Sequence, residues 1–521
     1  MRYGEILHVL GGLLMAVAVA MIPAGVLGAT EGMWLGWLVS LLVPGLLGLA
    51  FFTLTPREVD LSPREALAIV GLGWLGIVLT GALPFLLTGT TSSVAWAIFE
   101  SVSGFTTTGA TVFAVIEELP ASILLWRSLS HWIGGMGIIV LGVAILPLIG
   151  VGGAQLFSAE APGMTTDKVQ PRIATTARLL WGVYVTMTLI VVIAYIMLGM
   201  SLFDAVNHAM SALATGGFST RTASMGYYSP AIQWVTMLAM FLAGVNFTLH
   251  YRTFTGHPRE MFRNAEWKGY LASTLTVSAI CFFALGVSEG AFSLELVRRA
   301  SFSVISIHST TGFGTADFAA WPIVAQVLLL GLMFLGGMGG STGGGFKVIR
   351  GAVVTQHVLD EIRKVLHPRA VIITRVGGKP IREDLVLKVL AFLAMYMATH
   401  AVGTLILAAL GHDLVTALSA SLAALSSIGP GLGEVGPAGN YGHMGAAALI
   451  TLSVLMLMGR LEFYTLLVLL IPSTWTRTHR TPRPPRIWRR ERRRALSRAG
   501  RKADPMRSWP SHPHEIPRSG S

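Results

Sequence analysis

The chain has 521 residues, of which 53% are hydrophobic and only 12% are charged, and its formal net charge at pH 7 is +12. Soluble globular proteins carry about twice that charged fraction, so this composition argues against a soluble protein and for one that uses the lipid bilayer as its solvent. The single cysteine, Cys281, excludes both an intrachain disulfide and a thiolate metal site.

Apolar segments long enough to cross a bilayer recur along the whole chain. About 20 consecutive apolar residues span the hydrocarbon core as a helix, and this criterion predicts ten spanning helices. They lie near residues 6–28, 34–54, 66–88, 122–149, 178–200, 230–250, 269–287, 321–347, 386–410 and 442–471. The first has few N-terminal charges and no small-residue cleavage site, so we expect a retained span and not a removed signal peptide.

The spans group into an N-terminal pair, four similar units and a basic tail. We expect a two-helix extension over 1–54, pore repeats over 55–150, 151–250, 251–350 and 351–472, and a cytoplasmic tail over 473–521. The tail is rich in Arg and Pro and is expected to be disordered or to lie against anionic lipid. Within the first repeat, Ser62-Pro63-Arg64-Glu65 predicts the start of a helix.

Basic residues are concentrated in alternate loops. If the ten spans alternate in direction, 33 of the 38 Lys and Arg residues fall on one side. The positive-inside rule makes that side cytoplasmic, so both termini are expected in the cytoplasm and the positive charge indicates a membrane surface, not a nucleic-acid partner. The opposite face carries Glu117, Glu118, Glu289, Asp317 and Glu434. These acidic residues either attract cations into a vestibule or are ordinary solvated loop charges.

Each repeat contains a short segment that ends in a small or hydroxylated run and a glycine. The segments 93–108, 203–215, 296–311 and 414–428 are too short and too mixed to cross a bilayer, and they fit re-entrant half-helices. The turns that follow read Thr106-Thr107-Thr108-Gly109, Leu213-Ala214-Thr215-Gly216, Ser309-Thr310-Thr311-Gly312 and Ser426-Ser427-Ile428-Gly429. The four glycines recur about every 100 residues, so each unit has room for two spans and one re-entrant dip.

Backbone carbonyls from four such turns can meet around one axis and replace the water around a cation. The predicted carbonyl donors to the ion are Thr107, Thr108, Ala214, Thr215, Thr310, Thr311, Ser427 and Ile428, and Gly109, Gly216, Gly312 and Gly429 shape the turns. Half-helices entering from outside would direct their negative C-terminal ends at the ion. A Thr-Gly pair alone is weak evidence for a pore, and generic helix packing is the alternative. Four occurrences of a half-helix, a small or hydroxylated run, a glycine and a following helix favour the pore.

Glycines occupy most positions from 336 to 345 and cannot sustain a helix there. We predict a break that forms either a movable gate or a static kink, with the gate made of Gly339, Gly340, Ser341, Thr342, Gly343, Gly344 and Gly345. Arg460 lies inside the last span, where an arginine must find partners. Glu462 lies on a different face of the helix, so we expect Arg460 to hold the free carbonyls of the gate, with a purely structural ion pair as the alternative.

Together these residues resemble the Trk/Ktr/HKT superfamily of potassium transporters, in particular the bacterial TrkH-type potassium uptake proteins. The likeness rests on the four turns, the glycine segment, Arg460, Gly134-Gly135-Met136-Gly137, Asn246 and the stretch 160–163 leading to Pro171-Arg172-Ile173. It implies a homodimer in the bacterial inner membrane, with one pore per protomer and a cytoplasmic ring of TrkA-type nucleotide-binding subunits. It also implies that Gly109 favours K⁺, since plant relatives with serine there carry Na⁺.

One departure from the family concerns the fourth turn. TrkH-like chains read Asn-Asn-Leu-Gly-Pro-Gly at this place, whereas this chain reads Ser426-Ser427-Ile428-Gly429-Pro430-Gly431. The side-chain support of that turn must therefore differ, while the backbone chemistry should persist.

The expected protein is an all-α integral membrane protein with a fourfold pseudo-symmetric repeat of helix, re-entrant half-helix, filter turn and helix. Its expected function is potassium uptake driven mainly by the membrane potential, with K⁺ at the filter as the only metal and no covalently bound cofactor. A Na⁺- or H⁺-coupled alternating-access transporter is the alternative. An enzyme is not expected, because His131, His208 and His308 are scattered and fit packed or water-lining positions.

Overall fold

The described part of the computed structural model comprises residues 3–55, 63–144 and 169–475, and most of these residues are helical. The described residues from Tyr3 to Thr474 form one compact unit. Three expectations lie outside the described residues. They are the helix cap at Ser62, the stretch 160–163 and nearly all of the tail 473–521.

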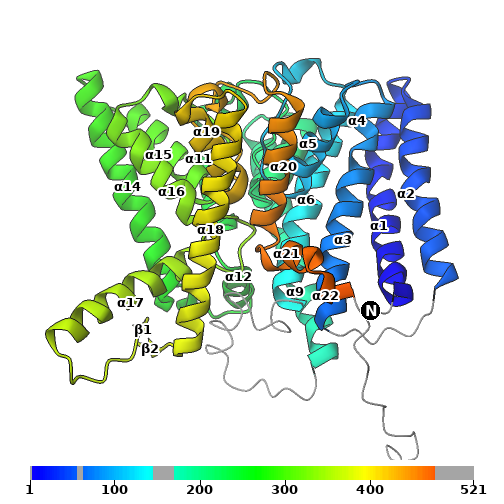
Figure 1. Cartoon of the computed structure of the whole chain (residues 1–521). Coiled ribbons are helices and arrows are strands. Elements are labelled where there is room, and N and C mark those ends of the chain that lie inside the picture. The colour runs from blue at the N-terminus through cyan, green and yellow to red at the C-terminus, as the bar shows by residue number, and fades with distance from the viewer. Residues whose placement is uncertain (1–2, 56–62, 145–168, 476–521) are drawn as a thin grey trace, which may run out of the picture. The chain divides into compact units, whose positions relative to one another are not determined.

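The same order of elements occurs four times: a long helix, a half-helix, a turn and a second helix. The first unit holds α3 (Pro63–Gly81), α4 (Leu83–Leu87), α5 (Val94–Phe105) and α6 (Ala121–Ala144), and the second holds α9 (Val169–Met197), α10 (Leu202–Leu213), α11 (Pro230–Ala243) and α12 (Phe247–Phe254). The third holds α14 (Ala265–Glu289), α15 (Leu294–His308) and α16 (Ile323–Leu335), and the fourth holds α18 (Glu383–Ala409), α19 (Leu414–Ser426), α20 (Ala446–Arg460) and α21 (Tyr464–Leu470). The half-helices are α5, α10, α15 and α19 (Figure 1).

A single 3₁₀ turn precedes the second helix in every unit. These turns are η1 (Ile116–Glu118), η3 (Ser224–Tyr227), η4 (Phe318–Ala320) and η5 (Gly433–Val435). The repeat therefore extends beyond the half-helix and its turn to the connection that follows.

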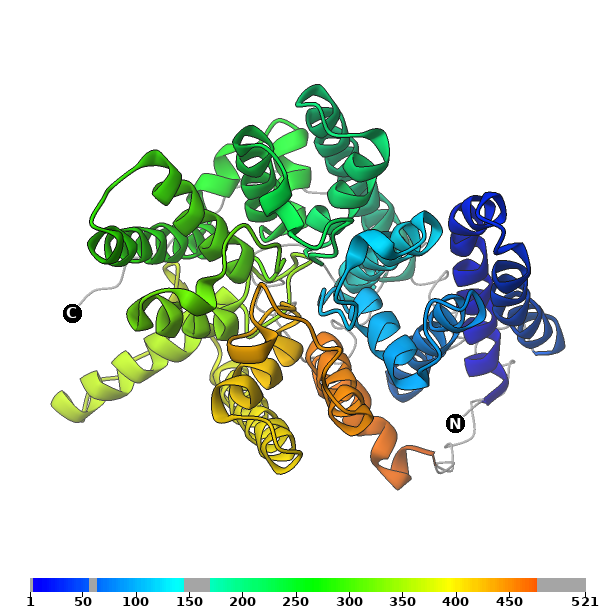
Figure 2. The ribbon, with the colours of Figure 1, turned by 90° about the horizontal axis from the view of Figure 1, so that it is seen from above.

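The four units close into a ring through one repeated contact. The second helix of each unit packs against the half-helix of the next: α6 against α10, α11 against α15, α16 against α19, and α20 against α5. The last of these contacts joins the fourth unit to the first. Viewed from above, the units follow one another around a centre at which their turns meet (Figure 2).

The N-terminal pair, α1 (Tyr3–Thr30) and α2 (Trp34–Leu54), stands outside this ring and packs against the first unit through α3 and α6. Gly11 and Gly48 face each other between the two helices. A Cβ at Gly11 would lie 2.6 Å from the carbonyl oxygen of Gly48, and a Cβ at Gly48 would lie 2.7 Å from that of Gly11. Glycine at both positions lets the backbones approach closely, as small residues do between helices in membranes.

Fewer helices than predicted can cross a bilayer by length and composition. Six described helices qualify: α1, α2, the stretch Arg64–Leu87 that joins α3 and α4, α9, α14 and α18. α11 and α12 make a seventh if they count as one span, although they bend by 104° at the break between them. On this criterion the described helices support seven of the ten predicted spans, counting the bent pair as one, and the span predicted over 122–149 extends beyond the described residues.

The three remaining predicted spans differ for identifiable reasons. The span predicted over 122–149 is described only as far as Ala144, where the described part of α6 ends after 24 residues. α16 and α20 have 13 and 15 residues, which is too short to cross the hydrocarbon core alone. The span predicted over 321–347 is helical only from Ile323 to Leu335, because Gly336 adopts a φ of +62° and ends the helix.

The long helices expose apolar side chains on their outer faces. In the most apolar windows of α1, α2, α9, α14 and α18 only 22–33% of residues are buried. Large exposed side chains on these helices include Val19, Leu35, Leu46, Val287 and Leu405. An apolar exterior of this extent is unfavourable in water and is the normal surface of a helix in hydrocarbon. The structure thus confirms an all-helical protein with several membrane spans.

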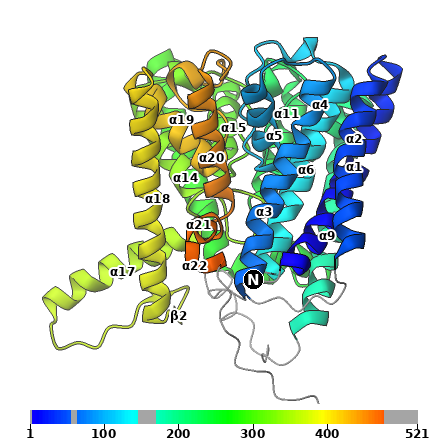
Figure 3. The same cartoon turned by 45° about the vertical axis from the view of Figure 1, so that its right-hand side comes forward.

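Several elements lie at the lower end of the molecule in Figures 1 and 3. They are α12, α13 (Arg259–Arg263), α17 (Val348–Leu366), the strands β1 (Arg375–Val376) and β2 (Lys379–Pro380), and α22 (Pro472–Trp475). The strands pair antiparallel across Gly377 and Gly378, both with positive φ. The all-α expectation omits this hairpin, because two-residue strands are too short to show alternation.

Candidate ion-conduction site

The four half-helices begin in the same way. Each is preceded by a side chain that accepts a hydrogen bond from the backbone of the first helical turn: Ser93, Ser201, Ser293 and Asp413. Hydrogen bonds from Thr416 hold the pKa of the Asp413 carboxyl below its ordinary value. Each half-helix then ends at one of the predicted turns, so that its negative end is directed at the turn.

The turns share one unusual backbone conformation. One residue at the end of each half-helix has a positive φ: Thr107 (56°), Thr215 (53°) and Thr310 (60°) directly follow the helix cap, and Ser427 (56°) is itself the cap of α19. Such a conformation costs free energy for a residue with a Cβ and persists only where the surroundings impose it. The next N–H donates to a carbonyl five residues earlier in every case: Thr108 to Ser103, Gly216 to Ser211, Thr311 to Ser306 and Ile428 to Ala423.

The glycine that follows in each turn packs against the neighbouring turn. A Cβ at Gly109 would collide with the carbonyl oxygen of Gly216, one at Gly217 with that of Thr311, one at Gly312 with that of Ile428, and one at Gly429 with that of Thr108. These contacts lead from the first turn to the second, third and fourth and back to the first. The four turns therefore form a closed ring, in which the touching carbonyls occupy the same position of each turn.

The second turn is shifted by one residue relative to the way in which the four turns were matched in the sequence, where Gly216 was paired with Gly109. Thr215, Gly216 and Gly217 correspond to Thr107, Thr108 and Gly109 in φ and in hydrogen bonding. The glycine with positive φ is Gly217 (φ 80°) and not Gly216, and Ala214 is the cap of α10, with helical φ and ψ. The sequence aligned the first glycine of a Gly-Gly pair, whereas the backbone uses the second, so Gly217 is a turn residue that sequence reasoning missed.

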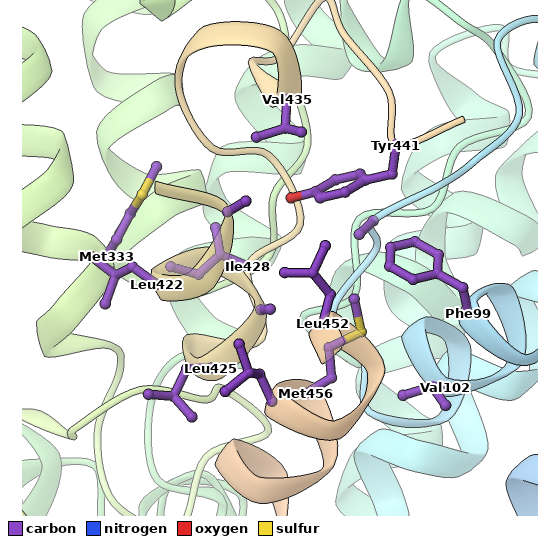
Figure 4. Close-up of a cluster of buried hydrophobic side chains, with 14 of the residues drawn as sticks. Phe99, Val102, Met333, Leu422, Leu425, Ile428, Val435, Tyr441, Leu452 and Met456 are labelled. Carbon is purple, nitrogen blue, oxygen red and sulfur yellow. The ribbon is translucent and has the colours of Figure 1, made fainter. Parts of the chain in front are cut away.

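Tyrosines support the fourth turn, where the sequence departs from the family pattern. The Tyr396 hydroxyl lies 2.5 Å from the Ser426 hydroxyl, and the Tyr441 hydroxyl donates to the carbonyl of Gly429 at 2.7 Å. The Ile428 side chain lies in the apolar cluster drawn in Figure 4, beside Leu422, while the Tyr441 oxygen points at the turn. The side chain of Ile428 thus packs into the apolar cluster, while the backbone carbonyl of Ile428 contacts the neighbouring turn in the ring.

A buried ion pair supports the first turn and joins it to the second. Glu100 on α5 accepts hydrogen bonds from the Thr111 hydroxyl and the Val112 N–H, at 2.6 and 2.7 Å, and pairs with Arg127 at 3.1 Å. Arg127 also donates to the carbonyl of Ser219, which follows the second turn, at 3.4 Å. Sequence reasoning missed this pair, although two opposite charges in apolar segments are a recognisable signal.

The glycine loop, residues 336–347, lies directly against the inner ends of three half-helices. The Thr342 hydroxyl is within hydrogen-bond distance of the carbonyl of Leu213, at 3.0 Å, and the Gly344 N–H donates to the Thr310 hydroxyl at 2.7 Å. A Cβ at Gly344 would collide with the carbonyl of Ser426. The loop is therefore in contact with α10, α15 and α19 where they meet their turns.

Arg460 joins this loop to the first unit. Its side chain is buried, and it donates to the carbonyl of Thr342 at 2.7 Å and to that of Gly134 on α6 at 3.2 Å. Glu462 pairs instead with Arg350 on α17 at 2.7 Å. Arg460 therefore contacts a loop carbonyl, as expected from the sequence, and Glu462 faces a different partner, also as expected.

The three histidines singled out in the sequence are buried and hydrogen-bonded. His131 lies 2.9 Å from the Ser211 hydroxyl, His208 2.9 Å from that of Ser219, and His308 2.9 Å from that of Thr274. They come from different units and do not converge on one point in the part of the chain that the structure describes. This confirms packed positions.

Comparison with known proteins identifies relatives along nearly the whole chain. The family described as "TrkH: Cation transport protein" matches residues 46–287 and 293–476. The Trk system potassium uptake protein TrkH of Vibrio parahaemolyticus is 40% identical over 485 residues, which cover 91% of this chain and 100% of the relative. TrkH of Escherichia coli is 40% identical over 421 residues, covering 80% and 87% of the two chains. TrkG of E. coli is 34% identical over 433 residues, covering 82% and 89%.

A solved structure has the same fold. The crystal structure of the potassium transporter TrkH from Vibrio parahaemolyticus superposes with a TM-score of 0.84 at 38% sequence identity, over 91% of this chain and 100% of that one. The overall fold described above is thus shared with a solved structure of a potassium transporter.

Proposed function

The chain belongs to the TrkH family of cation transport proteins, and on that premise we propose that it takes up potassium through a pore lined by backbone carbonyls of the four turns. It is a membrane protein of the bacterial Trk system and a transport protein, not an enzyme. The observation that carries the proposal is the closed ring, in which each turn glycine touches the carbonyl of the next turn. We take the pore to be built from the four repeats within 55–150, 151–250, 251–350 and 351–472.

The proposed ion ligands are carbonyl oxygens around the ring axis. We take the carbonyls of Thr108, Gly216, Thr311 and Ile428 as one layer and those of Thr107, Thr215, Thr310 and Ser427 as the next, because each set holds equivalent positions in the four turns. Rings of this kind replace the hydration shell of K⁺. The negative ends of four half-helices add a field that favours cations over anions, so no carboxylate is required at the ion.

The membrane potential supplies the proposed driving force. One charge crossing 100 mV gains about 2.3 kcal/mol, so a potential of about 150 mV alone could hold a K⁺ gradient of roughly 300-fold. We further propose that the glycine loop is the gate. Its contacts with three half-helices at their turns and with Arg460 support this proposal.

The proposed setting is the bacterial inner membrane, with both termini and α17 in the cytoplasm. The basic side chains of α17 and its hairpin, among them Arg363, Lys364 and Lys379, lie on that side. We propose this end as the docking side for a TrkA-type nucleotide-binding ring, and a homodimer as the working assembly. Co-purification of the two proteins from cells that express both is the direct measurement, and separate elution of the two would contradict the docking.

Uptake of ⁸⁶Rb⁺ into proteoliposomes under an imposed inside-negative potential tests the function. Gly312→Ala should lower uptake at least about tenfold, because a Cβ there is strained at φ 81° and collides with the next turn. Gly331→Ala is the matched control, since a Cβ added there would have no atom within 4 Å apart from its chain neighbours and the nearby backbone of its own helix. Uptake no greater than in empty liposomes would reject the pore. Uptake that needs a Na⁺ or H⁺ gradient instead of a potential would support coupled alternating access.

A further inference from the structure

The connection from α18 to α19 and the start of α20 lie at the upper end of the fourth unit, opposite the end that carries α17 (Figure 1). Three side chains of types that can ligate a metal ion come together in the segments between α18 and α20. They are His412 in the connection from α18 to α19, Glu434 in η5, and His443 in the segment that leads into α20. The Glu434 carboxylate lies 3.1 Å from Nε2 of His443 and 3.8 Å from Nδ1 of His412. All three donor atoms lie within 4.8 Å of one another.

The donor set identifies the kind of ion. Imidazole nitrogens are ligands for Zn²⁺ and neighbouring transition metals, whereas K⁺, Ca²⁺ and Mg²⁺ prefer oxygen. Two histidines and one carboxylate supply three of the four ligands of a zinc site, and a water molecule would occupy the fourth position. Donors about 2.1 Å from a tetrahedral zinc ion are about 3.4 Å apart, so the distances observed need only small side-chain rotations.

The backbone behind these three exposed or half-exposed side chains is firmly held. His412 directly precedes Asp413, the cap of α19. The Glu434 N–H donates to the Thr416 hydroxyl at 3.1 Å. His443 lies between the buried residues Tyr441 and Met444. A metal ion would therefore meet a pre-positioned set of ligands and would not have to order a loose loop.

We propose that His412, Glu434 and His443 form a binding site for a divalent transition-metal ion, with Zn²⁺ as the expected occupant. The site joins three separate segments of the fourth unit, each of them close in the chain to the ends of α18, α19 or α20. The ion adds two positive charges that the cluster itself cannot neutralise, because it offers a single carboxylate.

The same segments support the fourth turn, which connects the site to transport. The Gly431 N–H donates to the Val435 carbonyl at 2.7 Å, and the Tyr441 hydroxyl donates to the carbonyl of Gly429 at 2.7 Å. Bound metal would restrain the connection on both sides of this turn and repel arriving cations. This consequence rests on the proposed function: Zn²⁺ on the outer side should lower K⁺ uptake.

Calorimetric titration of the purified, tag-free full chain in detergent with ZnCl₂ tests the site without any need for transport. We expect one Zn²⁺ per protomer in the wild type and an affinity at least about tenfold lower in His443→Ala and in His412→Ala, since even outer-shell changes cost that much. His257→Ala, which removes an exposed histidine outside the cluster, is the control and should bind as the wild type does. Equal affinity in wild type and His443→Ala would overturn the site.

The second arm measures ⁸⁶Rb⁺ uptake with ZnCl₂ outside the proteoliposomes. We expect Zn²⁺ to lower uptake at least twofold in the wild type and in His257→Ala, and to leave His443→Ala unaffected. Inhibition that persists in His443→Ala would overturn the link between this site and transport, as would wild-type uptake that does not respond to bound Zn²⁺. An absence of uptake in metal-free buffer would count against the proposed function and not against the site.

Discussion

Replacing Arg460 by methionine tests the proposed gate most directly. The change keeps most of the side-chain length in a buried position but removes the donors to Thr342 and Gly134. A hydrogen bond from a charged group stabilises by about 1.5–3 kcal/mol. If the bond to Thr342 holds the loop closed, its loss should raise the open fraction by roughly 10- to 150-fold as long as the closed state predominates.

The assay is ⁸⁶Rb⁺ flux through reconstituted protein in the absence of any cytoplasmic partner, normalised to the amount of monodisperse protein recovered. Arg460→Lys keeps the charge but not the planar fork, so its leak should lie between those of the wild type and Arg460→Met. Arg299→Ala removes an arginine that is paired with Glu289 and touches neither the loop nor the turns, and its flux should match the wild type. Equal flux in Arg460→Met and the wild type, at equal recovery, would refute the gate.

Three further substitutions address other parts of the site. Tyr441→Phe removes the hydroxyl that donates to the fourth turn. Such a hydrogen bond contributes about 0.5–1.5 kcal/mol net, so the ratio of Rb⁺ to Na⁺ uptake should change about two- to tenfold. An unchanged ratio would contradict a supporting role for this hydroxyl. Glu100→Gln leaves the Arg127 charge buried without its partner and should destabilise the fold by about 3–5 kcal/mol, seen as a lower melting temperature in detergent; a melt within 1 °C of the wild type would contradict it. Thr342→Val removes a loop hydroxyl near the carbonyl of Leu213 and should increase leak, but less than Arg460→Met does; leak equal to the wild type would show that this hydroxyl does not hold the loop.

The order of elements was predictable from the sequence because each signal was local. Apolar runs marked the long helices, short mixed segments marked the half-helices, and the glycines from 336 to 345 marked the break after α16. The contact between Arg460 and a loop carbonyl was also predictable, because a buried guanidinium must find acceptors and an interrupted helix offers them.

Features that depend on three-dimensional register were not predictable in this way. In Gly216-Gly217 both residues are equally permissive, so the sequence could not tell which one adopts the positive φ. The length of α20 was overestimated because hydropathy continues past Arg460, while the backbone leaves the helix at Leu461. The supporting roles of Tyr396 and Tyr441 were hidden because they lie 30 and 12 residues from the groups they contact.

The closed ring of turns has a consequence for how selectivity can be tuned. In a channel assembled from four identical subunits, one codon alters all four walls of the pore, and any energetic change is counted four times. In the proposed pore each wall is encoded separately, so a substitution worth about 0.5 kcal/mol at one turn enters once and would shift an ion preference by little more than twofold. A single-chain filter can therefore be adjusted in small steps, and an asymmetric addition, such as a tyrosine behind one wall only, can persist without disturbing the other three.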